Sequence, residues 1–94
     1  MVDSFQPVFA DLVRNFTTTA GTGNFELGAV MTGYRGFETA VKPGDSFYYS
    51  VLGIEQADEF EVGRGTMQPD GTISRDPIGS ALTDFSEGNK SIAL

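Results

Sequence analysis

Phe60-Glu-Val-Gly-Arg-Gly-Thr-Met67 is followed by Gln68-Pro-Asp-Gly71 and then by Thr72-Ile-Ser-Arg-Asp76. Pro69 presets the backbone for the first corner of a type I turn, and Gly71 can adopt the left-handed conformation that a Cβ atom disfavours. The residues on either side of the turn include the β-branched and aromatic types that favour strands. The stretch therefore predicts a β-hairpin with a short bulged turn.

Side chains alternate between the two faces of a strand, so this hairpin has two distinct faces. In its first strand, Phe60 and Val62 share one face, and Glu61 lies on the other with Gly63 and Gly65. Two glycines on one face leave bare backbone, which an aromatic ring, another strand or another chain can approach closely. The predicted register pairs Gln68 with Thr72, Met67 with Ile73, and Gly65 with Arg75.

The rest of the chain is also typical of short strands joined by tight turns. The strongest predicted strand carries Phe47, Tyr49 and Val51 on one face and Tyr48 and Leu52 on the other. Bulky side chains on both faces predict a strand that is central in the sheet or covered on both sides. The other predicted strands are residues 15–19, 24–27 and 90–94, with turns at residues 20–23, 42–45 and 87–89.

Less regular segments connect these strands. Residues 28–36 predict a loop, with Tyr34 and Phe37 reaching the core, and residues 37–41 predict one turn of helix or a short strand. The threonines at residues 17–19 favour a strand with a solvated face. The last strand runs to the final residue, so it must pair within the fold or with another copy of the chain.

Residues 1–12 differ from the single β-domain that is predicted for residues 13–94. Apolar side chains recur there at helical spacing, but the segment is too short to be a stable free helix. Two interpretations remain open: an arm that docks on a neighbouring subunit or partner, or a helical or extended segment that covers one end of its own barrel. The residues expected to bind a partner are Phe5, Val8, Phe9 and Leu12 of the arm, with Ile92 and Leu94 of the last strand.

Composition excludes several classes of function. The 94 residues, 39% of them hydrophobic, suffice for one compact domain, while the absence of cysteine rules out disulfides and thiolate sites. The absence of histidine removes the usual general base and zinc ligand, and we expect no cofactor. A net charge of −7 with scattered basic residues disfavours binding to nucleic acid or to anionic membranes. The N-terminal residues lack the features of a signal peptide, which predicts a cytosolic site of synthesis.

The acidic residues are the remaining candidates for catalysis. Glu55, Asp58, Glu59 and Glu61 cluster in the sequence, and a hydrolase would need two such acids with different pKa values in one cleft. Alternation instead places Glu59 and Glu61 on what we expect to be the solvated side of an ordinary strand. Residues 70–76 superficially resemble a calcium loop but lack the required acidic ligands. We therefore expect no enzymatic activity.

Five short motifs, in this order, resemble a small β-domain that recurs in fibre- and spike-associated virion proteins of tailed bacteriophages and related particles. The resemblance extends from about Val13 to the C-terminus. The aromatic residue before Glu-Val-Gly is commonly Trp in that family and is Phe60 here. The matching residues are Val13 to Gly23; Gly33, Tyr34 and Phe37; Gly44, Asp45, Tyr48 and Tyr49; Glu61 to Thr66 with Ile73 to Arg75; and Phe85, Ser86, Gly88 and Lys90.

The resemblance and the patterns together predict an all-β fold, either a small β-sandwich or a partly open barrel, with a short N-terminal arm or helix. The resemblance implies a non-enzymatic virion structural protein, assembled in the bacterial cytoplasm. Such a protein would form a homo-oligomeric base or adaptor for a head or tail spike or fibre and would bind other virion proteins. The family's domain usually lies within longer proteins, which favours an adaptor here. The alternative is a module that binds host-surface carbohydrate through Tyr34, Tyr48 and Tyr49.

Overall fold

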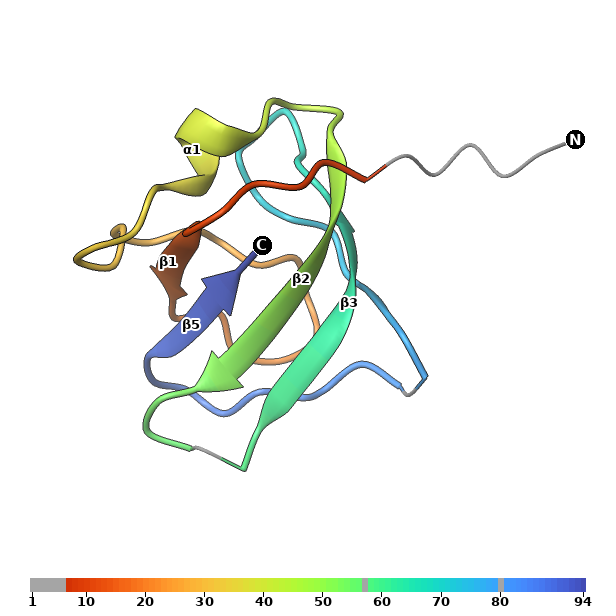
Figure 1. The fold of residues 1–94 in the computed structure, drawn as a ribbon. Helices are drawn as coiled ribbons and strands as arrows, with labels where there is room; N and C mark the ends of the chain where they lie inside the picture. The colour runs from red at the N-terminus through yellow and green to blue at the C-terminus, as the bar shows by residue number, and fades with distance from the viewer. Residues whose placement is uncertain (1–6, 57, 80) are drawn as a thin grey trace, which may run out of the picture.

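The protein forms one antiparallel sheet with very little helix, which confirms the all-β prediction (Figure 1). The computed structural model describes residues 7–56, 58–79 and 81–94. The strand order in the sheet is β1-β5-β2-β3-β4. The elements are β1 (Arg14–Thr17), α1 (Phe37–Ala40), β2 (Ser46–Gly53), β3 (Phe60–Thr66), β4 (Asp76–Pro77) and β5 (Lys90–Ala93).

Residues 24–31 join the two outer sides of this sheet, which therefore curls into a small, partly open barrel. On one side the Phe16 amide donates to the carbonyl oxygen of Ala29 (2.8 Å), next to β1. On the other side Phe25 and Ile73 exchange backbone hydrogen bonds of 2.9 Å, and Ile73 is bridged to Met67 just after β3. The outer edge of β1 is thus paired with residues 28–35 of the same chain.

The hairpin forms as the sequence predicts. Met67 lies opposite Ile73, and the Gly71 amide donates to the Gln68 carbonyl oxygen at 2.9 Å to close the turn. Gly71 has a φ of 87°, a left-handed conformation that explains why glycine occupies this corner. The turn before β2 is also confirmed, because the Asp45 amide donates to the Lys42 carbonyl oxygen at 2.9 Å.

The core lies inside the barrel and is rich in aromatic rings. Phe25 contacts Tyr49 and Phe85 edge to face, with ring centroids 5.7 and 5.9 Å apart. Phe37, at the start of α1, packs against Phe47 and is buried as predicted. The prediction for Tyr34 is wrong, because its side chain lies at the surface beneath the Arg14 guanidinium. The other buried apolar residues include Val13, Val41, Val51, Met67, Ile73 and Ile92.

The faces of β3 correct one expectation, and the position of β2 confirms another. Side chains alternate in β3 as predicted, but Phe60 is 63% exposed and Val62 is 50% exposed, whereas Glu61 is only 3% exposed. Glu61 is therefore not on the solvated side of the strand. β2 is central, which confirms the prediction, and its outer face is exposed at Tyr48 and Leu52.

The physical reason is the ring of Tyr49, which packs on the bare backbone of β3. A Cβ atom on Gly63 would lie 2.7 Å from the Tyr49 hydroxyl oxygen, and one on Gly65 would lie 3.1 Å from its ring. These glycines must face inward to accept the ring, and alternation then carries Glu61 inward and Phe60 outward. In β1 the same alternation buries Thr17, whereas Thr18, just after the strand, is exposed, so the predicted solvated face is only partly formed.

The N-terminal arm is extended from Pro7 to Ala10 and contains no helix in the part that the structure describes. The Val8 amide donates to the Ser46 carbonyl oxygen at 2.8 Å, which fixes the arm beside β2. Phe9 is largely exposed, with its ring 6.5 Å from that of Tyr48. Of the arm residues expected to bind a partner, Phe5 lies outside the described residues.

The C-terminal strand corrects a further expectation. β5 lies between β1 and β2 and pairs with both of them, so it offers no free edge to another copy. Ile92 is fully buried and Leu94 packs against the core. Pairing between copies through the terminal strand is therefore wrong for this fold, because the required backbone groups already have partners.

Candidate functional site

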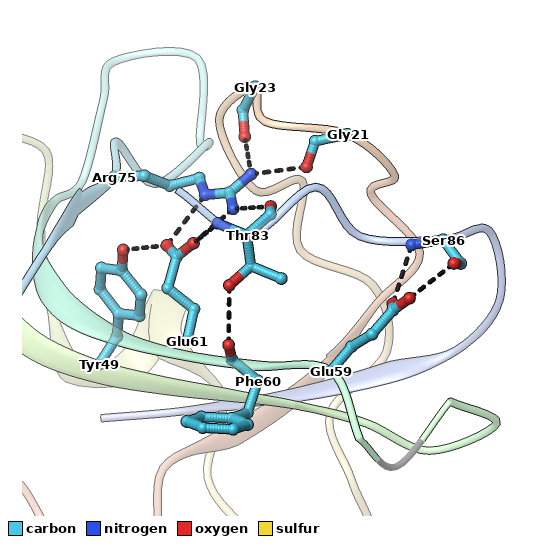
Figure 2. Close-up of polar contacts among 9 residues, drawn as sticks. All are labelled: Gly21, Gly23, Tyr49, Glu59, Phe60, Glu61, Arg75, Thr83 and Ser86. Atoms are coloured by element: carbon cyan, nitrogen blue, oxygen red, sulfur yellow. Dashed lines mark hydrogen bonds and ion pairs between the residues drawn. The ribbon is translucent and has the colours of Figure 1, made fainter. Parts of the chain in front are cut away.

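The strongest polar cluster of the molecule is a buried ion pair between Glu61 of β3 and Arg75 (Figure 2). The two side chains are 1% and 2% exposed, respectively. The Arg75 Nη2 group donates to Glu61 Oε1 at 2.6 Å, and its Nε group donates to Oε2 at 3.1 Å. This is the two-pronged geometry in which a guanidinium binds a carboxylate most strongly.

The remaining donors of Arg75 are also used. Its Nη1 group donates to the carbonyl oxygens of Gly21 and Gly23, both at 3.0 Å, and Nη2 donates to that of Thr83 at 2.7 Å. All five N–H groups of the guanidinium therefore have acceptors. The planar group also stacks over the Phe25 ring, 4.3 Å from its centroid.

The carboxylate oxygens of Glu61 also accept hydrogen bonds from residues other than Arg75. The Tyr49 hydroxyl donates to Oε2 at 2.5 Å, and the Thr83 amide donates to Oε1 at 2.8 Å. Burial opposes the charge on Glu61, but the hydrogen bonds from Arg75, Tyr49 and Thr83 outweigh it and lower the pKa of the carboxyl group. Burial, followed by the hydrogen bond to Glu61, raises the pKa of Tyr49 far above its ordinary value.

This arrangement is suited to holding segments together. It joins β2, β3, the strand region around Arg75, and the loops that contain Gly21, Gly23 and Thr83 (Figure 2). A general acid or base must reach a substrate proton, directly or through one water. The buried carboxylate of Glu61 already accepts four hydrogen bonds, so the cluster acts as a structural clasp.

The other acids of the predicted cluster do not gather around Glu61. Glu59 accepts hydrogen bonds from the Ser86 amide (2.9 Å) and hydroxyl (2.6 Å), which lower its pKa. Glu55 accepts from the Asn89 amide at 2.9 Å. Asp58 is exposed in the same loop region. Within the described residues, no group of three or more acidic side chains is placed to hold a metal ion.

The segment that resembles a calcium loop is a turn in the structure. Asp70 accepts hydrogen bonds from the Thr72 amide (3.0 Å) and hydroxyl (2.7 Å), which lower the pKa of its carboxyl group. A shallow hollow of about 470 Å³ lies beside this turn and α1. Its lining includes Glu26, Glu38 and Asp70, together with Thr72, whose hydroxyl is the donor to Asp70.

A second feature, the outer patch, is a set of exposed apolar side chains on the outside of the sheet: Leu52, Phe60, Val62 and Ile78. Leu52 and Phe60 are direct neighbours across β2 and β3. The Ile78 amide donates to the Val62 carbonyl oxygen at 2.9 Å, which continues the patch beyond β3. Figure 2 shows the Phe60 ring on the side of β3 opposite to Glu61.

Sequence reasoning missed this patch, although one signal could have revealed it. In β3, three positions of one face are Glu61, Gly63 and Gly65, and the predicted register of the hairpin places Arg75 opposite Gly65, next to the observed pair Arg64 and Asp76. An acid and an arginine that share a face with two glycines indicate a buried ion pair over bare backbone. The alternate residues, Phe60 and Val62, must then face outward.

The partner-binding residues that the sequence predicted are dispersed. Phe9 and Leu12 are exposed on the arm, Val8 is half-buried, and Ile92 lies in the core. The tyrosines expected to stack on sugars do not share a surface either, because Tyr49 is buried against Glu61. Tyr34 and Tyr48 remain at the surface.

Comparison with models of known families, with curated proteins and with solved structures finds no match to this chain. The resemblance described above therefore depends on its motif residues alone. Among the described residues, the structure contains no helix that is long and apolar enough to span a membrane.

Proposed function

We propose that this chain is a non-enzymatic structural protein that docks on other proteins through the outer patch. The observation that carries the proposal is the exposure of Phe60, which is 63% exposed at the start of β3, beside Leu52 of β2. Apolar side chains that are grouped on a surface mark sites of protein interaction more often than single exposed residues do. The buried polar cluster supports the same proposal, since it commits its titratable groups to holding the fold.

The narrower form of the proposal is a virion component of a tailed bacteriophage or a related particle. The motif resemblance favours a homo-oligomeric base or adaptor for a spike or fibre on the head or tail, assembled in the bacterial cytoplasm. The paired outer edge of β1 and the interior position of β5 are compatible with this role, because they favour face-to-face contact as the route to assembly. The partners would be further copies and other virion proteins.

The test is binding by the purified protein, both to itself and to virion proteins made by the same genome. Sedimentation would measure self-association, and pull-down would measure capture of capsid, tail or fibre proteins. Val62→Ser and Phe60→Ser should weaken binding at least tenfold and leave the circular dichroism spectrum unchanged. Ala20→Ser, an exposed substitution after β1, serves as the control and should bind normally. A wild-type protein that stays monomeric and captures no virion protein would contradict the proposal.

A further inference from the structure

A strained residue, Leu12, joins the N-terminal arm to the sheet. Among the residues that the structure describes, it is the only one other than glycine with a positive φ, 60°. In this left-handed conformation Cβ crowds the following carbonyl oxygen, which disfavours it by about 5- to 30-fold for an ordinary residue. The Leu12 side chain is 63% exposed, so its own packing does not compensate for the strain.

Few contacts hold the arm on its own body. The arm crosses the start of β2 on its way to β1 (Figure 1), where the Val8 amide donates to the Ser46 carbonyl oxygen at 2.8 Å. The Arg35 Nη1 group donates to the Asp11 carbonyl oxygen in a longer, exposed hydrogen bond of 3.3 Å. Val8 and Ala10 pack against the core but are only partly buried.

Relief of the strain at Leu12 would move the whole arm. Rotation about its N–Cα bond to an extended φ leaves Val13 and the rest of the sheet in place and swings residues 7–11 off the body. The Leu12 carbonyl oxygen lies on the fixed side of that bond, so it keeps its 2.6 Å hydrogen bond from the Arg35 amide. A relaxed Leu12 and an arm in its own site are therefore alternatives.

The vacated site determines what can fill it. An open arm leaves the Ser46 carbonyl oxygen without its donor and uncovers the apolar surface beneath Val8 and Ala10. Both changes are unfavourable unless an equivalent segment takes the place of the arm. Every copy of the chain carries the same arm and the same site. The arm of a second copy therefore restores the contacts at Ser46 while Leu12 is relaxed in both chains.

We propose that copies of this chain exchange their N-terminal arms, so that residues 7–11 of one copy lie beside β2 of another and Leu12 adopts an extended φ. This inference goes beyond the proposed function, because the exchange uses none of the outer-patch residues. It also combines the two interpretations of the arm, since the arm would cover the end of a barrel that belongs to a neighbouring copy.

Concentration decides between the closed and the exchanged forms. A closed arm needs no second molecule, so it is favoured in dilute solution, where association costs translational freedom. A reciprocal exchange relaxes two copies of Leu12, so the gain for one residue enters the equilibrium constant twice. Neighbouring copies in an assembly are held at effective concentrations of roughly millimolar, which favours exchange there.

The test uses thiol cross-linking, because the chain has no cysteine of its own. Full-length copies with Phe9→Cys are equilibrated with copies that carry Tyr48→Cys; both positions are exposed, and their rings lie 6.5 Å apart. A short bifunctional thiol reagent should then link two chains wherever the arm of one copy lies on β2 of another. The double variant in one chain, at low concentration, sets the length of the reagent.

A mixture of Thr18→Cys with Tyr48→Cys is the matched control for random collision. Thr18 is exposed just beyond the end of β1, at the far end of the sheet from Tyr48. We expect the Phe9→Cys mixture to give at least about five times the linked product of this control, and the yield should rise with protein concentration. Mass spectrometry of the linked peptides measures both yields.

Substitutions at Leu12 test the strain itself. Leu12→Pro fixes φ near −65° and so excludes the closed form, and in the described part of the chain the Leu12 amide donates no backbone hydrogen bond that proline would remove. It should raise the linked yield at least about fivefold. Leu12→Asn tolerates a left-handed φ and should lower the yield severalfold. Circular dichroism verifies folding, and Leu12→Asn alone tests the inference if Leu12→Pro does not fold.

The outcomes separate this inference from the proposed function. A linked yield no higher than that of the Thr18→Cys control, or one that does not respond to residue 12, overturns the exchange. Phe60→Ser should leave the linked yield unchanged. If chains are linked but no binding depends on Phe60, the exchange stands and the proposed function fails. Capture of a virion protein that depends on Phe60, without any linkage, overturns the exchange alone.

Discussion

At the scale of single residues, the stability of this protein depends on a charge pair that is costly to break. Glu61 and Arg75 are removed from water, and only their complete set of hydrogen bonds compensates for the lost hydration. The Arg64–Asp76 pair on the surface, at 3.2 Å, is a useful contrast because its side chains remain hydrated. Breaking the buried pair should therefore cost much more stability than breaking the exposed pair.

Replacing one partner of the buried pair should be far more damaging than replacing one partner of the exposed pair. We expect Glu61→Gln to lower the free energy of unfolding by about 3–5 kcal/mol, because Arg75 stays charged and buried. Asp76→Asn should cost at most about 1 kcal/mol. Urea unfolding followed by fluorescence or circular dichroism would measure both free energies.

Arg75→Lys provides a second measurement if Glu61→Gln does not fold. Lysine keeps the charge but has too few donors for the carbonyl oxygens of Gly21, Gly23 and Thr83 as well as for Glu61. The double variant Glu61→Leu with Arg75→Met should lose less stability than the two single losses added together. Equal, small losses for the buried and exposed pairs would refute the clasp as a source of stability.

At the scale of elements, β3 is built to receive a ring from β2. Gly63 and Gly65 leave room for Tyr49, and the Tyr49 hydroxyl reaches Glu61 on the same face of β3. The strand therefore carries its polar contact and its aromatic contact inside the barrel and its own large apolar residues outside. Because the large apolar side chains of β3 point outward, the outer patch is exposed on the surface.

Adding one methyl group to this face of β3 should disturb the contact between the two strands. A Cβ atom at Gly63 would lie 2.6 Å from the Asp76 carbonyl oxygen and 2.7 Å from the Tyr49 hydroxyl oxygen. We expect Gly63→Ala to lower the free energy of unfolding by about 1–3 kcal/mol, as overpacking does. Thermal or urea unfolding would measure the change.

Gly23→Ala is the matched control, because no atom lies within 4 Å of its added Cβ and its φ is not left-handed. It should leave stability unchanged or raise it by up to about 1 kcal/mol through the loss of chain entropy in the unfolded state. A Gly63→Ala variant as stable as the Gly23→Ala variant would show that Tyr49 does not depend on bare backbone in β3.

At the scale of the whole molecule, the clasp sets limits to stability at both ends of the pH range. Folded Glu61 has a pKa below the ordinary 4.5, so it binds fewer protons than the unfolded chain does in mild acid. Its contribution is present above about pH 4.5 and is lost as the pH falls through the lowered pKa. Tyr49 has a pKa above the ordinary 10.0, so its contribution is present below pH 10 and is lost as the pH rises further.

We expect the free energy of unfolding to fall below about pH 4.5 and again above pH 10. Urea unfolding across the pH range would measure this profile. Tyr49→Phe should be less stable at neutral pH but should show a smaller further decline in alkali, because it has no phenol to ionise. Glu59 and Asp70 add to the acid limit, so Glu61→Gln should reduce the acid decline without abolishing it. An identical alkaline decline in Tyr49→Phe and wild type would refute the role of Tyr49.

Local rules predicted much of the fold. The hairpin turn, its register with Met67 opposite Ile73, and the central position of β2 all depend on neighbouring residues and their conformational limits. The burial of Phe37 followed from its size and spacing. The arm was predicted less well, because a short apolar segment can be helical or extended according to the surface that it meets.

The candidate site was hardly predicted, since it depends on contacts between distant segments. The clasp joins Gly21, Tyr49, Glu61, Arg75 and Thr83, and only Glu61 and Arg75 are related by a local pattern, the register of the hairpin. β5 was also misjudged, because a strand at the end of a chain can lie at an edge or between two others. Its place between β1 and β2 follows from the closure of the barrel.

By itself, the sequence determined where most of the strands and turns lie and which side chains share a face, because glycine, proline and the two-residue period of a strand act over a few bonds. The exception is residues 24–27, which form only a single bridge at Phe25 instead of the predicted strand. Only the tertiary structure decided which of the two faces is inside. Alternation assigns the side chains of β3 to two faces but does not determine which face is buried. The packing of the Tyr49 ring on Gly63 and Gly65 buries the face that carries these glycines. That one contact buries Glu61 and leaves Phe60 at the surface.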